Sequence, residues 1–230
     1  MFVSLPNRAK SGLRWATPLL FLVLLGTFVF ATMGSGPEQR ALLTGWGALS
    51  GGLAAPDAWG AAFRDGRALR LVTALFLHAD WAHLLGNLVF LLIFGLPAER
   101  AMGPWRFLLL FLLGGAVANL AAALSIGEPD RIIIGASGAV SAVIGAYLAL
   151  FPRAKLGVVV PLGLFLEFVR APASLLIGIW ALLQVVFAYI GPTLGAVAWW
   201  AHLAGFAFGV VFAIVVRAAI ARRLRRQRGF

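Results

Sequence analysis

Long apolar runs separated by short polar segments make up most of this chain. A helix that crosses a lipid bilayer needs about 20 predominantly apolar residues, and six runs come close to or exceed that length. Their expected bounds are residues 17–33, 75–96, 104–125, 135–151, 172–190 and 199–220. The pattern predicts an all-α integral membrane protein that folds as a bundle of six transmembrane helices.

The six runs are expected to form one domain, residues 17–220, between a cytoplasmic N-terminal segment, residues 1–16, and a basic cytoplasmic tail, residues 221–230. The first run follows Arg8, Lys10 and Arg14, an arrangement that a cleaved signal peptide also has. It is long for a signal peptide, and no clean small-x-small cleavage site follows it before Met33. We therefore expect it to remain as the first span.

Composition excludes a soluble globular domain. Hydrophobic residues make up 62% of the chain and charged residues 12%, whereas soluble domains average about 45–50% and about 25%. The chain has no Cys, which excludes disulfides, a thiol nucleophile and cysteine-based metal sites.

The formal net charge of +11 could indicate a nucleic acid partner, but its distribution favours a membrane explanation. If the N-terminus is cytoplasmic, fourteen of the nineteen Lys and Arg residues fall on the cytoplasmic side of the six spans. Cytoplasmic loops of membrane proteins carry such an excess. This predicts that both ends are cytoplasmic, that the arginines of the tail meet anionic lipid, and that no nucleic acid is bound.

Two connecting segments are expected to have structure of their own. Residues 34–70, on the outer side, are rich in Gly and Trp and are expected to form short amphipathic helices in the membrane interface. In the cytoplasmic segment 153–170, the β-prone runs 158–160 and 165–169 flank Pro161-Leu162-Gly163, which predicts a small hairpin.

Polar groups are costly at membrane depth, so those inside the apolar runs need an explanation. His83 and Asn87 lie four residues apart on one face of the second run, and His78 comes just before them. Taken alone, this pattern fits a hydrogen bond between helices. A metal site is less favoured, because the chain has only three His and its carboxylates lie outside the spans.

Two further polar residues open apolar runs, Ser137 in the fourth and His202 in the sixth. The second, fourth and sixth spans all begin on the outer side, so these residues should converge with His83 and Asn87 at one depth. A serine needs a base to become a nucleophile, and imidazole can take its proton and return it. His83, Asn87 and the N–H of Ser137 can supply donors to an oxyanion. No Asp or Glu lies at this depth, so the pattern predicts a Ser–His dyad.

Small residues on the fourth and sixth runs favour close helix packing. Gly138 and Gly145 lie on the fourth run, and Gly205 and Gly209 lie on the sixth in a GxxxG spacing. A hydrogen bond of about 3 Å between side chains of neighbouring helices needs such an approach.

From Arg70 to the end of the sixth run, these motifs resemble those of the rhomboid family of intramembrane serine proteases. Gly135-Ala136-Ser137-Gly138 is similar to the family's GxSG motif, and Ala201-His202-Leu203-Ala204-Gly205 with Gly209 is similar to its histidine motif. Residues 70–78 resemble the family's entry to the second span, with Leu69 in place of the usual Trp. Glu99-Arg100 resembles the acidic–basic pair that closes that span.

The resemblance implies an endopeptidase, free of metal and cofactor, that cleaves transmembrane segments of other membrane proteins near the outer face of the membrane. The small six-span form and the short termini lead us to expect a bacterial inner membrane. The resemblance also implies lateral substrate entry near the fifth span and a cap formed by residues 191–198. Some members carry an aromatic residue one turn after the nucleophile, where this chain has Ser141, which leaves open how His202 is braced. The implied catalytic residues are Ser137 and His202, the implied oxyanion donors are His83 and Asn87, and the implied supporting residues are His78, Gly135, Gly138, Gly205 and Gly209.

Two other functions fit a six-span membrane protein. A rhomboid-like pseudoprotease would bind or escort membrane proteins, but such relatives usually lack the serine or the histidine. A transporter or channel is disfavoured, because no carboxylate lies in mid-span and the polar groups gather at one end. The sequence assigns neither a natural substrate nor an oligomeric state.

The charge distribution predicts how single cysteines will be labelled, and the absence of native Cys makes the test clean. Cysteines in place of Ala41 and Gly195 should react with a membrane-impermeant thiol reagent added outside intact cells, whereas a cysteine in place of Ala154 should not. The reverse pattern would invert the topology and place Ser137 on the cytoplasmic side.

Overall fold

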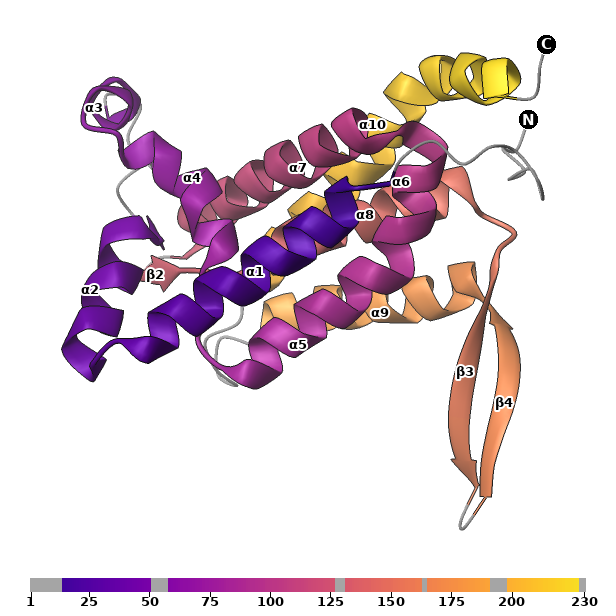
Figure 1. Ribbon diagram of the computed structural model, residues 1–230, viewed down its shortest axis with the longest axis horizontal. Coiled ribbons are helices and arrows are strands. Elements are labelled where there is room, and N and C mark those ends of the chain that lie inside the picture. Colours follow the sequence, from indigo (N-terminus) through magenta and orange to yellow (C-terminus); the bar gives the residue numbers. More distant parts are fainter. Residues whose placement is uncertain (1–13, 51–57, 127–130, 163–164, 191–197, 228–230) are drawn as a thin grey trace.

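The computed structural model describes residues 14–50, 58–126, 131–162, 165–190 and 198–227. Its helical bundle confirms the predicted fold class (Figure 1). A π-helical turn, Leu91–Gly95, joins α5 to α6, so these two helices form one continuous span. The bundle consists of α1 (Ala16–Met33), α5 (Trp81–Phe90) with α6 (Leu96–Met102), α7 (Pro104–Ser125), α8 (Ser137–Leu150), α9 (Ala173–Ile190) and α10 (Trp199–Gln227).

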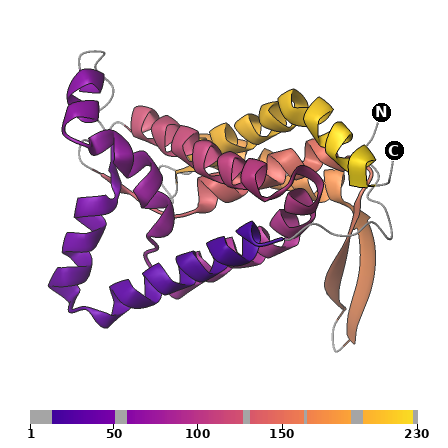
Figure 2. The same cartoon turned by 45° about the horizontal axis from the view of Figure 1, so that its top comes forward.

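The outside of the bundle is apolar, as contact with lipid requires. Large side chains such as Phe30 on α1, Leu182 on α9 and Val215 on α10 are exposed. Within the described residues, five helices are long and apolar enough to cross a membrane, the α5–α6 pair counting as one. The chain is therefore a multi-pass integral membrane protein, with the start of α1 and the end of α10 at the same end of the bundle (Figures 1 and 2).

The helix α8, which corresponds to the fourth expected span, is shorter than the predicted range 135–151. Its 14 residues extend about 21 Å at about 1.5 Å per residue, whereas the hydrocarbon core is about 30 Å thick. One end of α8 therefore lies inside the membrane. The exposed Arg153 follows the other end closely, so the immersed end is the one that begins with Ser137.

The second span begins and ends about six residues later than the expected run 75–96. Ala74–Phe76 forms a 3₁₀ turn, and Asp80 is the N-cap of α5, its carboxylate accepting a hydrogen bond from the N–H of His83 at 2.8 Å. Apolar residues lie both before and after His78 and Asp80, so hydrophobicity alone does not mark the helix start. The helix start is marked by the N-cap residue Asp80, whose carboxylate binds the N–H of His83 in the first turn.

Glu99 is buried near the end of the second span because it caps another helix. Its two carboxylate oxygens accept hydrogen bonds from the N–H groups of Ala16 at 2.9 Å and Thr17 at 2.8 Å. The first N–H groups of a helix have no partner within that helix, so Glu99 joins α6 to the start of α1. Leu24 and Phe28 of α1 belong to the core, which favours a retained first span over a cleaved signal peptide.

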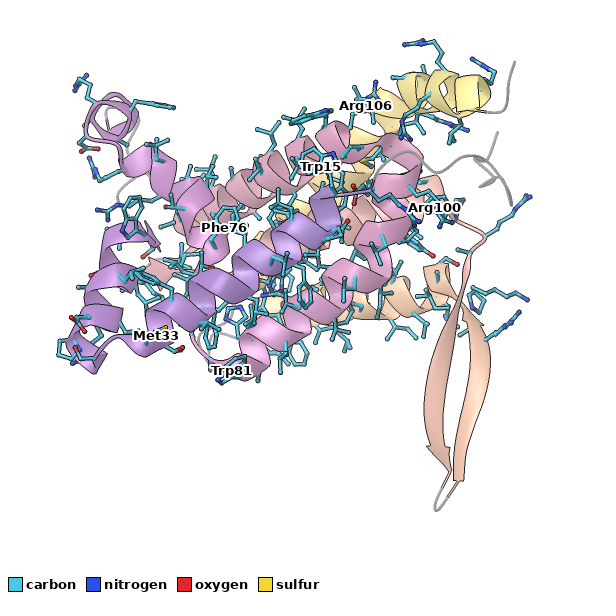
Figure 3. All side chains as sticks on the ribbon, viewed as in Figure 1. Trp15, Met33, Phe76, Trp81, Arg100 and Arg106 are labelled. Carbon is cyan, nitrogen blue, oxygen red and sulfur yellow. The ribbon has the colours of Figure 1, made fainter. Side chains whose placement is uncertain are left out.

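The last helix continues past the expected residue 220 into the basic tail and ends at Gln227. Arg223 in this extension donates from Nη1 to the carbonyl oxygen of Arg100 at 3.0 Å. Arg100 and Arg106 lie at the same end of the bundle, and Met33 and Trp81 lie at the opposite end (Figure 3). This placement agrees with the asymmetric charge distribution.

Two small antiparallel ribbons accompany the helices. The predicted hairpin is confirmed as β3 (Lys155–Leu162) and β4 (Phe165–Pro172), which extend away from the bundle (Figure 1). A second ribbon pairs β1 (Ala48–Leu49) with β2 (Ile132–Ile133). It was not predicted, because strands of two residues leave no recognisable pattern.

The short helices expected in segment 34–70 are present as α2 (Gly36–Trp46) and α3 (Ala58–Arg64), and α4 (Arg70–Thr73) follows at its end. Ser35 and Glu38 form a capping box at the start of α2, which satisfies its first N–H groups. Most of the expected cap, residues 191–197, lies outside the described residues, as do Arg8 and Lys10.

Candidate active site

Ser137 is the first residue of α8, and the backbone before it explains why the helix starts there. Gly135 has a φ of 112°, a conformation that residues with a side chain rarely adopt. A Cβ atom at this position would also lie 2.6 Å from the ring of His83. The first N–H groups of α8 have no carbonyl partner within the helix, so the N–H of Ser137 can bind a ligand.

His202 lies in the first turn of α10, and its Nε2 is 2.9 Å from the Oγ of Ser137. Glycines allow this contact between residues that are far apart in the sequence. A Cβ atom at Gly205 would meet the carbonyl oxygen of Gly138, and one at Gly209 would meet that of Ala142. The backbones of α8 and α10 therefore touch, which brings the two side chains within hydrogen-bond distance.

Gln184 on α9 is a member of the site that the sequence analysis missed. Its Oε1 lies 2.7 Å from Nδ1 of His202, on the side of the ring opposite Ser137. The side chain is buried, although most of α9 is exposed apolar surface. An uncharged amide inside an apolar run was the available signal, because such a group needs a partner at membrane depth.

Ser141 does not brace His202. Its hydroxyl donates to the carbonyl oxygen of Ser137, one turn earlier, at 2.7 Å. The aromatic neighbour of His202 is instead Trp199, whose ring meets the imidazole edge to face at a centroid distance of 6.0 Å. The question that the sequence left open is thus answered by Gln184 and Trp199.

His78 orients Asn87. Burial lowers the pKa of His78 to about 4, so its ring is neutral at physiological pH. Its Nε2 lies 3.1 Å from Nδ2 of Asn87 and accepts from the N–H of Ala136 at 3.4 Å. An amide nitrogen carries two hydrogens, so Asn87 keeps a second donor while His78 fixes its direction.

Two cavities meet at the Ser137–His202 pair, and both are also lined by His83. The larger has a volume of about 580 Å³ and includes Asp80 and Arg131 in its wall. The smaller has a volume of about 280 Å³ and lies between α5 and α9. Within the described part of the chain, no group of three His, Asp or Glu could hold a metal ion.

The comparison with known proteins agrees with the motifs. Residues 65–219 match the model of the rhomboid domain, which is more than half of the chain. The chain belongs to the rhomboid family. The matched range includes Ser137, His202, His83, Asn87 and Gln184.

Similar rhomboid proteins come from distant organisms. The putative rhomboid protease YdcA of Bacillus subtilis (strain 168) is 38% identical over 85 residues, covering 36% of this chain and 42% of that protein. RHOMBOID-like protein 12, mitochondrial, of Arabidopsis thaliana is 35% identical over 133 residues, covering 51% and 37%. Rhomboid-like protease 3 of Toxoplasma gondii is 37% identical over 113 residues, covering 49% and 38%. The chain thus spans less than half the length of each relative.

The glycine contact predicts the effect of one added methyl group on this rhomboid. Gly205→Ala should push α10 away from α8 and break the Ser137–His202 hydrogen bond. Reaction of Ser137 with a fluorophosphonate should then slow by about 10²-fold or more, as expected for loss of a general base. The control is Gly178→Ala on α9, where no atom lies within 4 Å of the added Cβ. A folded Gly205→Ala variant that is labelled at the wild-type rate would contradict this explanation.

Proposed function

We propose that this rhomboid is an intramembrane serine endopeptidase that cleaves transmembrane segments of other membrane proteins. The observation that carries the proposal is the 2.9 Å contact between Ser137 Oγ and His202 Nε2, at the immersed start of a short buried helix. A serine beside an imidazole is the pair that acyl transfer requires. One of the relatives is named a putative rhomboid protease and another a rhomboid-like protease.

In the proposed acylation step, the Oγ of Ser137 attacks the carbonyl carbon of the scissile bond while Nε2 of His202 takes the hydroxyl proton. The C–N bond then breaks, and His202 gives this proton to the leaving amine. An ester between Ser137 and the N-terminal part of the substrate remains. In deacylation, water attacks the ester carbonyl, His202 takes the water proton and returns it to Ser137 Oγ, and a carboxylic acid product leaves.

We assign three hydrogen-bond donors to the negative charge that would develop on the carbonyl oxygen. They are the N–H of Ser137, the ring of His83 and the second amide hydrogen of Asn87. Fixed donors in a site of low dielectric stabilise a developing oxyanion more than water does. This chemistry requires neither a metal nor a cofactor.

The two cavities differ in polarity, and we assign water to the larger one and the substrate segment to the smaller one. The larger cavity has charged and polar groups in its wall and would supply the water for deacylation. The smaller has Phe90 and Trp180 in its wall, between α5 and α9, and would admit an apolar substrate segment from the lipid. From the charge distribution we infer that the site faces the outer side of the membrane, and we propose that this membrane is a bacterial inner membrane.

A pseudoprotease that only binds or escorts membrane proteins is the alternative. Both members of the Ser–His pair are present in this chain and in contact, which favours the enzyme.

Substitutions at the site separate these two functions. Ser137→Ala and His202→Ala should each abolish cleavage of a transmembrane substrate by the purified protein while leaving it folded, because no activated nucleophile forms. Asn87→Ala should lower turnover by about 10²–10³-fold, the usual cost of losing one oxyanion donor. Full activity of Ser137→Ala would overturn the mechanism.

The mechanism also predicts which substrate segments are cleaved. A regular helix ties its carbonyl oxygens into hydrogen bonds, so a segment must unwind locally to reach Ser137. Each freed backbone group is costly in lipid, and Gly weakens a helix by about 1 kcal/mol relative to Ala in water. Replacing Gly or Pro near the cut site by Leu, with the residues flanking the bond unchanged, should slow cleavage. Equal or faster cleavage of the Leu-containing segments would exclude this requirement.

A further inference from the structure

A buried amide on the fifth span contacts the side of His202 that faces away from Ser137. Gln184 is only 6% exposed, while its neighbours Leu183 and Val185 are 45% and 40% exposed. Its Oε1 lies 2.7 Å from Nδ1 of His202. A polar group at this depth is costly unless it is paired, so its presence calls for a role.

We propose that Gln184 is the positioning residue for His202, with the place that a buried carboxylate has in a serine protease triad. The proposal rests on the proposed function, in which His202 is the general base. An amide oxygen can only accept a hydrogen bond, so its contact with Nδ1 requires that Nδ1 carries the imidazole proton. Nε2 is then unprotonated and can take the proton of Ser137, 2.9 Å away.

The other tautomer could not work as the base. It would direct an N–H at the hydroxyl of Ser137, and Nε2 would have no lone pair for the proton. The reverse orientation of the Gln184 amide would favour that tautomer, because an NH₂ group would then face Nδ1. The orientation with Oε1 toward His202 is therefore the one that a base requires.

The polar side chains of Ser141 and Asp80, which also lie near the site, have other hydrogen-bond partners than Nδ1 of His202. The hydroxyl of Ser141 is bonded to the carbonyl oxygen of Ser137, and the carboxylate of Asp80 accepts from the N–H of His83. Trp199 contacts the imidazole through its ring, which restricts tilting of the imidazole but does not select a tautomer.

Gln184 also links the base to the position of a whole helix. The hydrogen bonds join α9 to α10 and α10 to α8. Only a few described residues of α9 are buried, namely Ala173, Ile177, Gln184 and Ala188. A displacement of α9 away from α10 would break the bond to Nδ1, so the alignment of His202 depends on where α9 lies.

The test compares two variants of the full chain with a matched control. Gln184→Met keeps the length of the side chain but removes the acceptor, and kcat for a transmembrane substrate should fall by about 10- to 100-fold, the worth of one hydrogen bond to a group that becomes charged. KM should stay unchanged, because the lost interaction matters only in the transition state. Gln184→Glu keeps an acceptor and should retain most of the activity. Leu183→Met, at the exposed neighbouring position, should behave as wild type.

A spectroscopic measurement separates this proposal from the proposed function. The chain has three His, so nitrogen-15 NMR of histidine-labelled protein can be assigned with His202→Ala. The wild type should carry the His202 proton on Nδ1, and Gln184→Met should shift it partly to Nε2. A wild-type protein with the proton on Nε2, or a Gln184→Met variant with unchanged kcat and tautomer, would overturn the proposal. If the wild type cleaves no substrate but the tautomer shifts as expected, the protease function fails and the positioning role stands.

Discussion

The close approach of α8 and α10 is the constraint on which the site depends. Helices with ordinary side chains at their contact pack with axes about 8–10 Å apart, whereas a Ser–His hydrogen bond tolerates only tenths of an ångström. Gly205 and Gly209 remove the side chains from this contact, and the carbonyl oxygens of Gly138 and Ala142 occupy the space. The distance between Ser137 and His202 is thus fixed by backbone packing.

The short length of α8 decides the environment of Ser137. Because the helix spans only part of the bilayer, its free N–H groups lie at a depth where unpaired backbone groups are costly. The cavity beside Ser137 lowers the cost of burying these N–H groups, because it can hold water that hydrogen-bonds to them. In the proposed mechanism, the same N–H groups, which would be costly in lipid, bind the substrate carbonyl. The position of the start of α8 inside the membrane therefore depends on the water-accessible cavity beside Ser137.

The helical bundle and most of the site could be predicted from the sequence, because apolar runs and the polar residues within them can be recognised locally along the chain. Ser137 and His202 stand where a lipid-facing or core helix would carry Leu or Val, and the glycines recur at helical spacing. The start of α5 at Trp81 was missed, since apolar residues lie on both sides of Asp80 and the start of the helix is marked by a capping hydrogen bond. Gln184 was missed for a different reason. A single amide in an apolar run has many uses, and its partner is decided by how α9 packs against α10, which no spacing along the chain encodes.

The low polarity of the membrane explains why an amide, and not a carboxylate, lies beside His202. A carboxylate would hold the Nδ1 proton more strongly, but a charged residue at the centre of a membrane helix costs about 2.5–3.5 kcal/mol on insertion scales. That cost would be paid in every state of the protein, whereas the extra stabilisation of an imidazolium would be needed only during the proposed proton transfer. α9 is largely exposed to lipid, so a charge there would also have to be shielded whenever the helix moved. A neutral acceptor such as the Gln184 amide fixes the same tautomer of His202 without this cost.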